Sequence, residues 1–201
     1  MTCTCGSIGA PPEIRQCPEH FHYWLGDQRM ASIGSVIKSV LPTDYSMVRP
    51  DVLENARLRG VFVDRWFCEY VMCGDIDIPA GCPQEYDDYL SRVINWWDKN
   101  GLKAVATQQI VWCAMDGIAG RFDIRIAGDM IVDLKCVSAR QPSYRLQLGA
   151  YASMADDTAP GVGIGILHAT KTDVKLVPYS TEDCRANWLA AVDWWEVKES
   201  L

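Results

Sequence analysis

The sequence has no long apolar run and no excess of positive charge. Among its 201 residues, no apolar stretch reaches the roughly 18 residues that a membrane-spanning helix needs. The amino terminus has no basic segment followed by an apolar core, so we expect no signal peptide, no membrane partner and a cytoplasmic protein. The formal net charge is −7, which argues against nonspecific binding of nucleic acid over the whole surface.

Internal repeats and low-complexity segments are also lacking. With 49% hydrophobic and 22% charged residues, the chain has enough apolar side chains to bury a core. The nine cysteines are an odd number, and several lie in apolar surroundings, such as Cys68 and Cys136. Free thiols in a reducing compartment explain this better than a disulfide framework does. We expect one domain at residues 25–201, preceded by an appendage at residues 1–24.

The appendage contains candidate zinc ligands. Cys3 and Cys5 are followed, across a loop with prolines, by Cys17 and His20. Thiolates and imidazole are the usual ligands of a four-coordinate structural zinc ion. Because Cys-x-Cys is less typical of zinc sites than Cys-x-x-Cys, a tail with incidental thiols is the alternative.

Two segments with alternating apolar and polar residues predict a β-hairpin. They cover residues 122–126 and 130–136, and Asp123, Asp133 and Lys135 are among the polar positions. Side chains alternate between the two faces of a strand, so the polar side chains are expected to point away from the core. A turn between the segments would make the strands antiparallel neighbours. The two carboxylates would then lie close together, presented rather than buried.

Two carboxylates and a lysine on neighbouring strands suit phosphodiester hydrolysis. Asp123 and Asp133 would raise each other's pKa unless a cation lay between them, and such a cation also neutralises charge on a scissile phosphate. Lys135 would position or activate the attacking water. The alternative is a pair of charges at a sheet edge, balanced by Lys135 and Arg125.

The Asp-x-Lys triplet alone is weak evidence. With 18 Asp and 7 Lys in the chain, random placement gives about 0.6 such triplets, and a second one is present at Asp173-Val174-Lys175. That copy lies in a polar stretch, and we interpret it as a solvated hairpin. The first copy has Asp123 upstream and a predicted helix downstream, where Gln147 and Tyr151 share one face.

These landmarks together resemble the PD-(D/E)xK nuclease superfamily, and within it the RecB-like and phage exonuclease branch. The resemblance implies an α/β (α+β) fold with a central mixed β-sheet flanked by helices, built on a restriction-endonuclease-like αβββαβ core. It makes residues 25–201 a PD-(D/E)xK nuclease-like domain. The segment from Arg57 to Gly60 resembles the Arg-Gly helix that precedes the hairpin in that branch.

The resemblance also implies residue roles. The implied catalytic residues are Asp123, Asp133, Lys135, Gln147 and Tyr151. The implied ligands of Mg²⁺ or Mn²⁺ are Asp64, Asp123, Asp133 and the backbone carbonyl of Leu134. The implied DNA contacts are Arg57, Arg59, Arg121, Arg140 and Arg145. Basic residues outnumber acidic ones five to three between Arg121 and Arg145, which predicts a basic groove in an acidic protein.

Two positions depart from the family pattern. Asp64 stands where the branch has a histidine, and an aspartate suits Mg²⁺ or Mn²⁺ because these ions prefer oxygen ligands. Gln109 stands where the family usually has a further acidic residue, so one charge is missing. A one-metal enzyme, a slow enzyme and an inactive relative are all compatible with these departures. An iron–sulfur cluster is not expected, because Cys184 is the only cysteine after the catalytic helix.

The expected function is a Mg²⁺- or Mn²⁺-dependent DNA nuclease, an exonuclease of phage recombination or DNA processing, with DNA and a recombination protein as partners. The alternative is a nuclease-like protein that binds DNA or a protein partner without cutting. Strand polarity, the choice between ends and internal sites, the number of strands and the oligomeric state stay open.

The remaining periodicity predicts the other elements. Helices are expected at residues 32–41, 50–72, 85–100, 142–154 and 181–198, and further strands at residues 103–115 and 162–169. The pairs at residues 96–97 and 194–195 are tryptophans, which we expect in the core, with a partner interface or a base-stacking wedge as the alternative.

Overall fold

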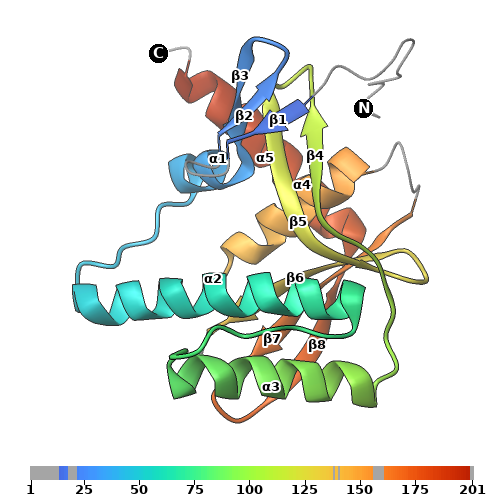
Figure 1. Ribbon diagram of the computed structural model, residues 1–201. Helices are drawn as coiled ribbons and strands as arrows, with labels where there is room; N and C mark the ends of the chain where they lie inside the picture. The colour runs from blue at the N-terminus through green and yellow to red at the C-terminus, as the bar shows by residue number, and fades with distance from the viewer. Residues whose placement is uncertain (1–13, 18–21, 138, 140, 156–160, 200–201) are drawn as a thin grey trace.

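The computed structural model describes residues 14–17, 22–137, 139, 141–155 and 161–199. In these residues five helices and eight strands follow one another along the chain (Figure 1). The helices are α1 (Ile33–Val40), α2 (Pro50–Cys73), α3 (Gln84–Lys99), α4 (Ser143–Ala155) and α5 (Thr181–Glu199). The strands are β1 (Ile14–Gln16), β2 (Tyr23–Leu25), β3 (Gln28–Ser32), β4 (Ala104–Cys113), β5 (Ile118–Ile126), β6 (Met130–Cys136), β7 (Gly163–Ala169) and β8 (Val174–Tyr179). Within the described residues, none of the helices could span a membrane.

All eight strands join one mixed sheet. Its order is β1-β2-β3-β5-β6-β7-β8, and β4 pairs with β5. The β3–β5 and β6–β7 pairs are parallel, and the other pairs are antiparallel. β5 contacts β3 at its start, β4 along its length and β6 at its end, so it is the centre of the sheet.

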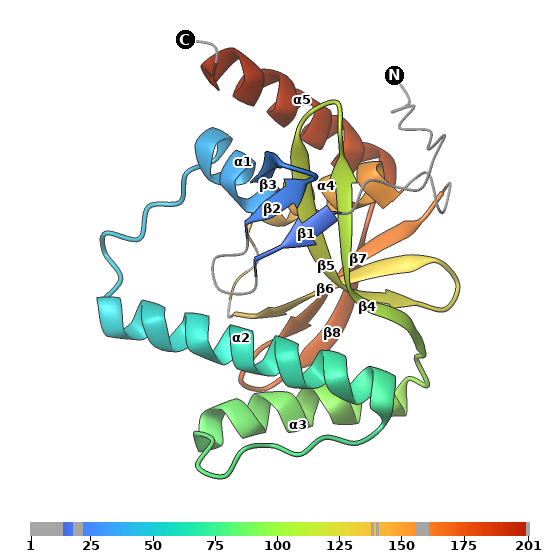
Figure 2. The ribbon, with the colours of Figure 1, turned by 45° about the horizontal axis from the view of Figure 1, so that its top comes forward.

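Helices pack on the sheet in two groups, each with its own core. One core joins the sheet to α1, α4 and α5 and includes Leu148 and Trp188. The other joins it to α2 and α3 and includes Phe67 and Leu90. Both ribbon views show α2 and α3 side by side, away from α5 (Figure 2). The predicted fold class, a mixed sheet flanked by helices, is confirmed.

Most predicted elements are present, with shifted ends. β5 begins at Ile118, four positions before the predicted start at residue 122. The second Asp-x-Lys triplet lies at the start of β8, where Asp173 and Lys175 are exposed and pair at 3.6 Å, as its interpretation as a solvated hairpin requires. In the amino-terminal segment, β1 and β2 continue the sheet through β3. The described part of that segment therefore belongs to the main sheet.

The tryptophan pairs divide between core and surface. Trp97 is buried against Phe67, with the ring centroids 5.3 Å apart, as predicted. Trp195 packs against the core of α1, α4 and α5. The prediction of a core position is wrong for Trp194, which is 61% exposed, because it lies on the outer face of α5.

The central strand does not keep the simple alternation that its sequence predicts. Phe122 belongs to the core of α4 and α5, whereas Ile124 belongs to the core of α2 and α3. A regular strand would turn these two side chains to one face. The change occurs at Asp123, and Gln108, which lies opposite Asp123 on β4, has a positive φ of 52°. The prediction that all apolar residues of 122–126 share one face is therefore wrong.

Candidate active site

The β5–β6 hairpin opens at the first predicted carboxylate. Regular pairing joins Ile124–Ile126 to Met130–Val132, and Asp123 and Asp133 come next in register. There the side chain of Asp123 takes over the hydrogen bonding, since its Oδ2 accepts from the backbone N–H of Leu134 at 2.8 Å. A carboxylate thus lies between the two strands, beside the strand that carries the second carboxylate.

The second carboxylate and the predicted catalytic lysine form an ion pair. Asp133 Oδ2 is in direct contact with Lys135 Nζ. Asp133 is only 1% exposed, so the expectation that the polar face of the hairpin is open is wrong here, because α4 covers that face. Burial alone would lower the pKa of Lys135, but the charges of Asp133 and Asp123 outweigh burial and raise it. Lys135 is therefore a cation at neutral pH.

α4 brings Gln147 and Tyr151 to the same place. The two side chains are four residues apart and directly bonded, with Gln147 Nε2 donating to the Tyr151 hydroxyl at 2.7 Å. The hydroxyl lies 2.9 Å from the backbone carbonyl of Arg121 and 3.5 Å from Asp133 Oδ1. Burial and the nearby charges of Asp133 and Asp123 raise the pKa of Tyr151 well above its usual value, so the hydroxyl keeps its proton.

A third carboxylate, Asp64, comes from α2. It accepts hydrogen bonds from Gln108 Nε2, at 3.1 Å to Oδ1 and 3.2 Å to Oδ2. Cys68, one turn later, donates its thiol hydrogen to Asp64 Oδ1 at 3.4 Å and lies 3.5 Å from the carbonyl of Asp123. Burial, and secondarily the charge of Asp133, raises the pKa of Asp64. Asp64 is thus close enough to the hairpin to interact with its charges.

Two of the carboxylates, Asp64 and Asp123, are disfavoured in their charged forms by burial and by the charge of Asp133. Burial raises the pKa of Asp123 well above its usual value, and the charges of Asp133 and Asp64 raise it further, while Lys135 and the Leu134 N–H partly offset these effects. Buried oxygen ligands of this kind fit Mg²⁺ or Mn²⁺, whose charge would favour the ionised carboxylates. Within the described residues, no three His, Cys, Asp or Glu side chains already converge tightly enough to hold a metal ion.

The predicted DNA-contacting arginines occupy different positions. Arg59 is 9% exposed, and it donates to Glu85 Oε1 at 2.9 Å and to the carbonyl of Cys136 at 3.1 Å. It therefore links α2 to α3 and to the end of β6 instead of facing solvent. Arg57 is exposed and pairs with Glu54 on its own helix.

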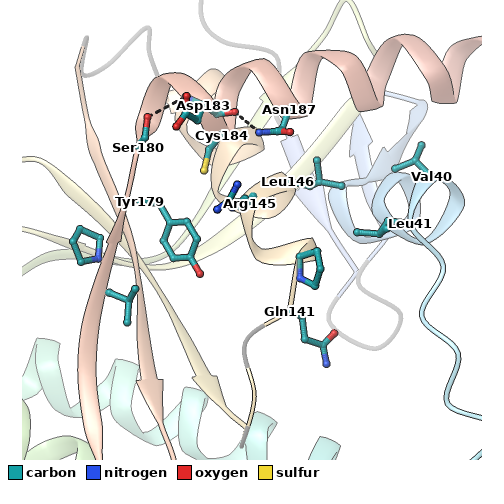
Figure 3. Close-up of a pocket in the computed structure, with 13 residues that line it drawn as sticks. Val40, Leu41, Gln141, Arg145, Leu146, Tyr179, Ser180, Asp183, Cys184 and Asn187 are labelled. Carbon is teal, nitrogen blue, oxygen red and sulfur yellow. Dashed lines mark hydrogen bonds between the residues drawn. The ribbon is translucent and has the colours of Figure 1, made fainter.

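Arg121 and Arg145 line neighbouring cavities close to the site. A cavity of about 610 Å³ is lined by Arg121, Gln147 and Tyr151 together with Lys38 of α1. A second cavity, of about 860 Å³, shares Leu41 and Gln141 with the first and is lined by residues of α4, β8 and α5. Figure 3 shows Arg145 in this second cavity, between Leu146 and Cys184. Both cavities are wide enough to admit parts of a ligand larger than a metal ion.

Several predicted residues fall outside the described chain. They are Cys3, Cys5, His20 and Arg140. Cys17 is described; it is half-buried, and its backbone N–H donates to the carbonyl of His22 at 2.8 Å. The zinc site and the DNA contact of Arg140 stay predictions, as does the Leu134 carbonyl as a metal ligand.

Sequence reasoning missed two residues of the site, Gln108 and Cys68. The glutamine assigned to the family's acidic position was Gln109, but Gln109 is exposed and Gln108 is the one that reaches Asp64. Two adjacent glutamines look alike in a sequence, and only the backbone at Gln108 decides which side chain points inward. For Cys68, the spacing of four residues from Asp64 on one helix face was the available signal.

No family model matches the chain, and no curated protein matches it. Among solved structures, one from Eubacterium rectale, whose description as an exonuclease is itself provisional, has a TM-score of 0.59 at 18% identity over 82% of this chain and 77% of that one. An alkaline exonuclease from Laribacter hongkongensis has a TM-score of 0.47 at 10% identity over 84% of this chain and 87% of that one. At 18% identity the first similarity shows a shared fold, so this chain has the α/β fold of the Eubacterium rectale protein.

Proposed function

We propose that the protein is a divalent-metal-dependent DNA nuclease of the PD-(D/E)xK superfamily, in the RecB-like and phage exonuclease branch, and that it acts as an exonuclease. The observation that carries this proposal is the convergence of Asp123, Asp133 and Lys135 where the β5–β6 hairpin opens, beside Asp64 of α2. A structural ion pair needs one acid and one base. Here a buried pair of one acid and one lysine lies beside two further carboxylates, Asp123 and Asp64, whose charged forms are disfavoured chiefly by burial, which is a typical arrangement for a cation site.

The roles follow from these contacts. Asp123 and Asp133, with Asp64, would hold Mg²⁺ or Mn²⁺, which when bound neutralises charge on the scissile phosphate and acidifies water. Lys135 carries its positive charge at the same place and would orient the attacking water and stabilise the hydroxide form. An ammonium has three N–H donors, so Lys135 can keep its contact with Asp133 Oδ2 and still donate to the water.

Tyr151 and Gln147 support the site without exchanging protons. The neutral Tyr151 hydroxyl holds the backbone of β5 at Arg121 and faces Asp133. Gln147 donates to that hydroxyl and so determines which way its proton points. We infer that this pair maintains the separation of β5 and β6 at which both carboxylates face one cation.

Nucleic acid would reach the site through the two neighbouring cavities. Their cationic lining residues are Arg121, Lys38 and Arg145, and phosphate oxygens bind such groups. Local positive charge can attract DNA even though the whole protein has a net charge of −7. Arg59 is not part of this proposed contact, because it is buried in its pair with Glu85.

One observation favours the second candidate function, a nuclease-like protein that binds without cutting. Asp133 is already paired with Lys135, and Asp64 with Gln108, so two of the three carboxylates have partners within the protein. The two candidates differ in whether cleavage occurs with a divalent metal.

The decisive experiment uses the purified full chain with Mn²⁺ on single-stranded DNA, double-stranded DNA and RNA. We expect linear DNA to be degraded, and Lys135→Ala and Asp133→Asn to abolish degradation. The second triplet supplies matched controls, because Lys175→Ala and Asp173→Asn change an exposed Asp-x-Lys pair and should leave cleavage intact. Absence of cleavage by the wild type on all three substrates would refute the enzyme and leave the binding candidate.

DNA contact is tested separately from cleavage. With metal removed by EDTA, Arg145→Ala should weaken DNA binding and reduce its salt dependence by about one counterion. Arg49→Ala removes an exposed arginine of the same charge that is already paired with Asp51, and it is the matched comparison. Equal binding by both variants and the wild type would exclude Arg145 from the DNA contact.

Zinc at the amino terminus is an additional proposal. About one equivalent of bound zinc, lost on Cys17→Ser, is expected for a four-ligand site. Absence of zinc in the purified protein would leave the cysteines without this role.

A further inference from the structure

Gln108 has an unusual backbone for its residue type. Its φ is +52°, in the left-handed region that side chains other than glycine rarely adopt. The residue lies within β4, between Thr107 and Gln109, which pair with Ile124 and Phe122 on β5. Gln108 is therefore directly opposite Asp123. Strained backbone at a single residue persists where the surrounding structure requires it, and it often marks a functional site.

The strained backbone turns one amide toward the carboxylate of α2. Gln108 Nε2 lies 3.1 Å from Asp64 Oδ1, 3.2 Å from Asp64 Oδ2 and 3.1 Å from Cys68 Sγ. A single amide nitrogen near both oxygens restricts rotation of the Asp64 carboxylate. Its neighbour Gln109 is exposed and makes none of these contacts.

We propose that Gln108 is a positioning residue that fixes the Asp64 carboxylate beside Asp123 and confines the site to one divalent cation. The proposal rests on the proposed metal-dependent function and identifies a residue that controls its metal. Amide hydrogens point at the Asp64 oxygens from the β4 side, so a cation cannot approach them there. Cys68 contacts both Asp64 Oδ1 and the backbone carbonyl of Asp123, which places Asp64 near that part of β5. Partners that orient a metal ligand typically change metal affinity by about 10–100-fold when they are removed.

The test is calorimetric titration of Mn²⁺ into the full chain. We expect one Mn²⁺ per chain for the wild type, with heat that Asp123→Asn abolishes. Gln108→Gly removes the amide and accepts the positive φ, so the melting temperature should be maintained while the Mn²⁺ affinity falls by about 10–100-fold. Gln109→Gly is the matched control, and it should bind Mn²⁺ as the wild type does.

Gln108→Glu is the second variant. It replaces the blocking amide by a fourth carboxylate, so we expect the stoichiometry to rise from one Mn²⁺ to two. Unchanged affinity in Gln108→Gly, with a stoichiometry still of one in Gln108→Glu, would overturn the inference and leave the proposed function standing. Absence of Asp123-dependent heat in the wild type would overturn both. If Gln108→Gly does not fold, the stoichiometry of Gln108→Glu decides.

Discussion

The Asp123 carboxylate accepts a hydrogen bond from the backbone N–H of Leu134 at 2.8 Å, at the point where the β5–β6 ladder stops. A side chain thus satisfies the backbone donor that a further strand pair would otherwise use. This contact ties the first carboxylate to the strand of the second. It explains how two acidic groups are brought together in a largely buried place.

Asp123→Asn should stabilise the metal-free protein at high pH. The folded-state pKa of Asp123 is raised, chiefly by burial, so its contribution to stability is present at low pH and is lost as the pH rises through the folded pKa. Asparagine still accepts from Leu134 but never ionises. In EDTA at pH 8, the melting temperature of the variant should exceed that of the wild type by a few degrees, since about 1 kcal/mol corresponds to roughly 2–4 °C in a chain of this size. At pH 5 the two melting temperatures should be nearly equal. The same difference at both pH values would contradict the raised pKa.

Lys135→Met should destabilise the metal-free protein as well as stop cleavage. The change leaves Asp133, which is 1% exposed, without its cation. Breaking a buried ion pair by removing one partner costs about 3–5 kcal/mol. Urea unfolding in EDTA measures the loss, and Mn²⁺ should restore part of it. Lys175→Met, in the exposed pair with Asp173, should cost about 0–1 kcal/mol, and a similar loss in both variants would be evidence against a buried charge at Asp133.

Tyr151→Phe should strongly reduce the rate of cleavage, while the protein stays folded with a moderate loss of stability. Without the hydroxyl, the Arg121 carbonyl and Gln147 Nε2 each lose a partner, at a cost of about 1–3 kcal/mol. The carboxylate geometry at Asp133 would also relax. The comparison is Tyr70→Phe, which removes a hydroxyl that donates to Asp98 at the surface. Wild-type turnover by folded Tyr151→Phe would show that the hydroxyl has no role in the reaction.

Arg59→Leu should lower stability without a specific effect on DNA binding. Arg59 joins Glu85 and the Cys136 carbonyl, and its guanidinium lies 4.6 Å from the ring centroid of Tyr89. Its loss leaves the buried Cys136 carbonyl without this donor and removes the contact with Tyr89, so a cost of about 1–3 kcal/mol in thermal or urea unfolding is expected. Arg57→Leu should stay within about 0.5 kcal/mol of the wild type. If the Arg59→Leu protein folds but binds DNA clearly more weakly, Arg59 does take part in DNA binding.

Gly149→Ala should disrupt the packing of α4 on α5. A Cβ on Gly149 would lie 2.0 Å from the carbonyl oxygen of Cys184 and 3.0 Å from Trp188 Cβ, so the helices would have to separate. Loss of the cooperative thermal transition, or a large fall in melting temperature, is expected. Gly60→Ala is the matched change in α2, where no atom lies within 4 Å, and it should stabilise by roughly 0.5–1 kcal/mol. Tolerance of Ala at 149 would show that the two helices are less closely packed.

The elements of this fold could be predicted from the chain because their signals are local. The turn at Gly128 and Asp129, the alternation of residues 130–136 and the helical spacing of Gln147 and Tyr151 depend on neighbours within a few positions. Each was found where it was predicted. β1, β2, β3 and β8 were not predicted; β1 and β2 have three residues each and carry almost no periodicity.

The candidate site was only partly predictable, because only local signals can be found in a sequence. Asp123, Asp133, Lys135, Gln147 and Tyr151 were all selected from their spacing, and the structure brings them together. What spacing cannot show is contact between distant segments. The approach of Asp64 and Cys68 to β5, the burial of Arg59 and the choice of Gln108 over Gln109 all depend on how α2 packs against the sheet.

The sequence by itself determined which residues are candidates for the site and which strands and helix carry them, because side-chain chemistry and periodicity are properties of short segments. The tertiary structure alone decided that the hairpin opens at Asp123, that α4 buries Asp133 and that Gln108 holds the Asp64 carboxylate of α2. The physical reason is that burial and charge coupling depend on distances between segments far apart in the chain, and these distances are set by the packing of two helical layers on one bent sheet.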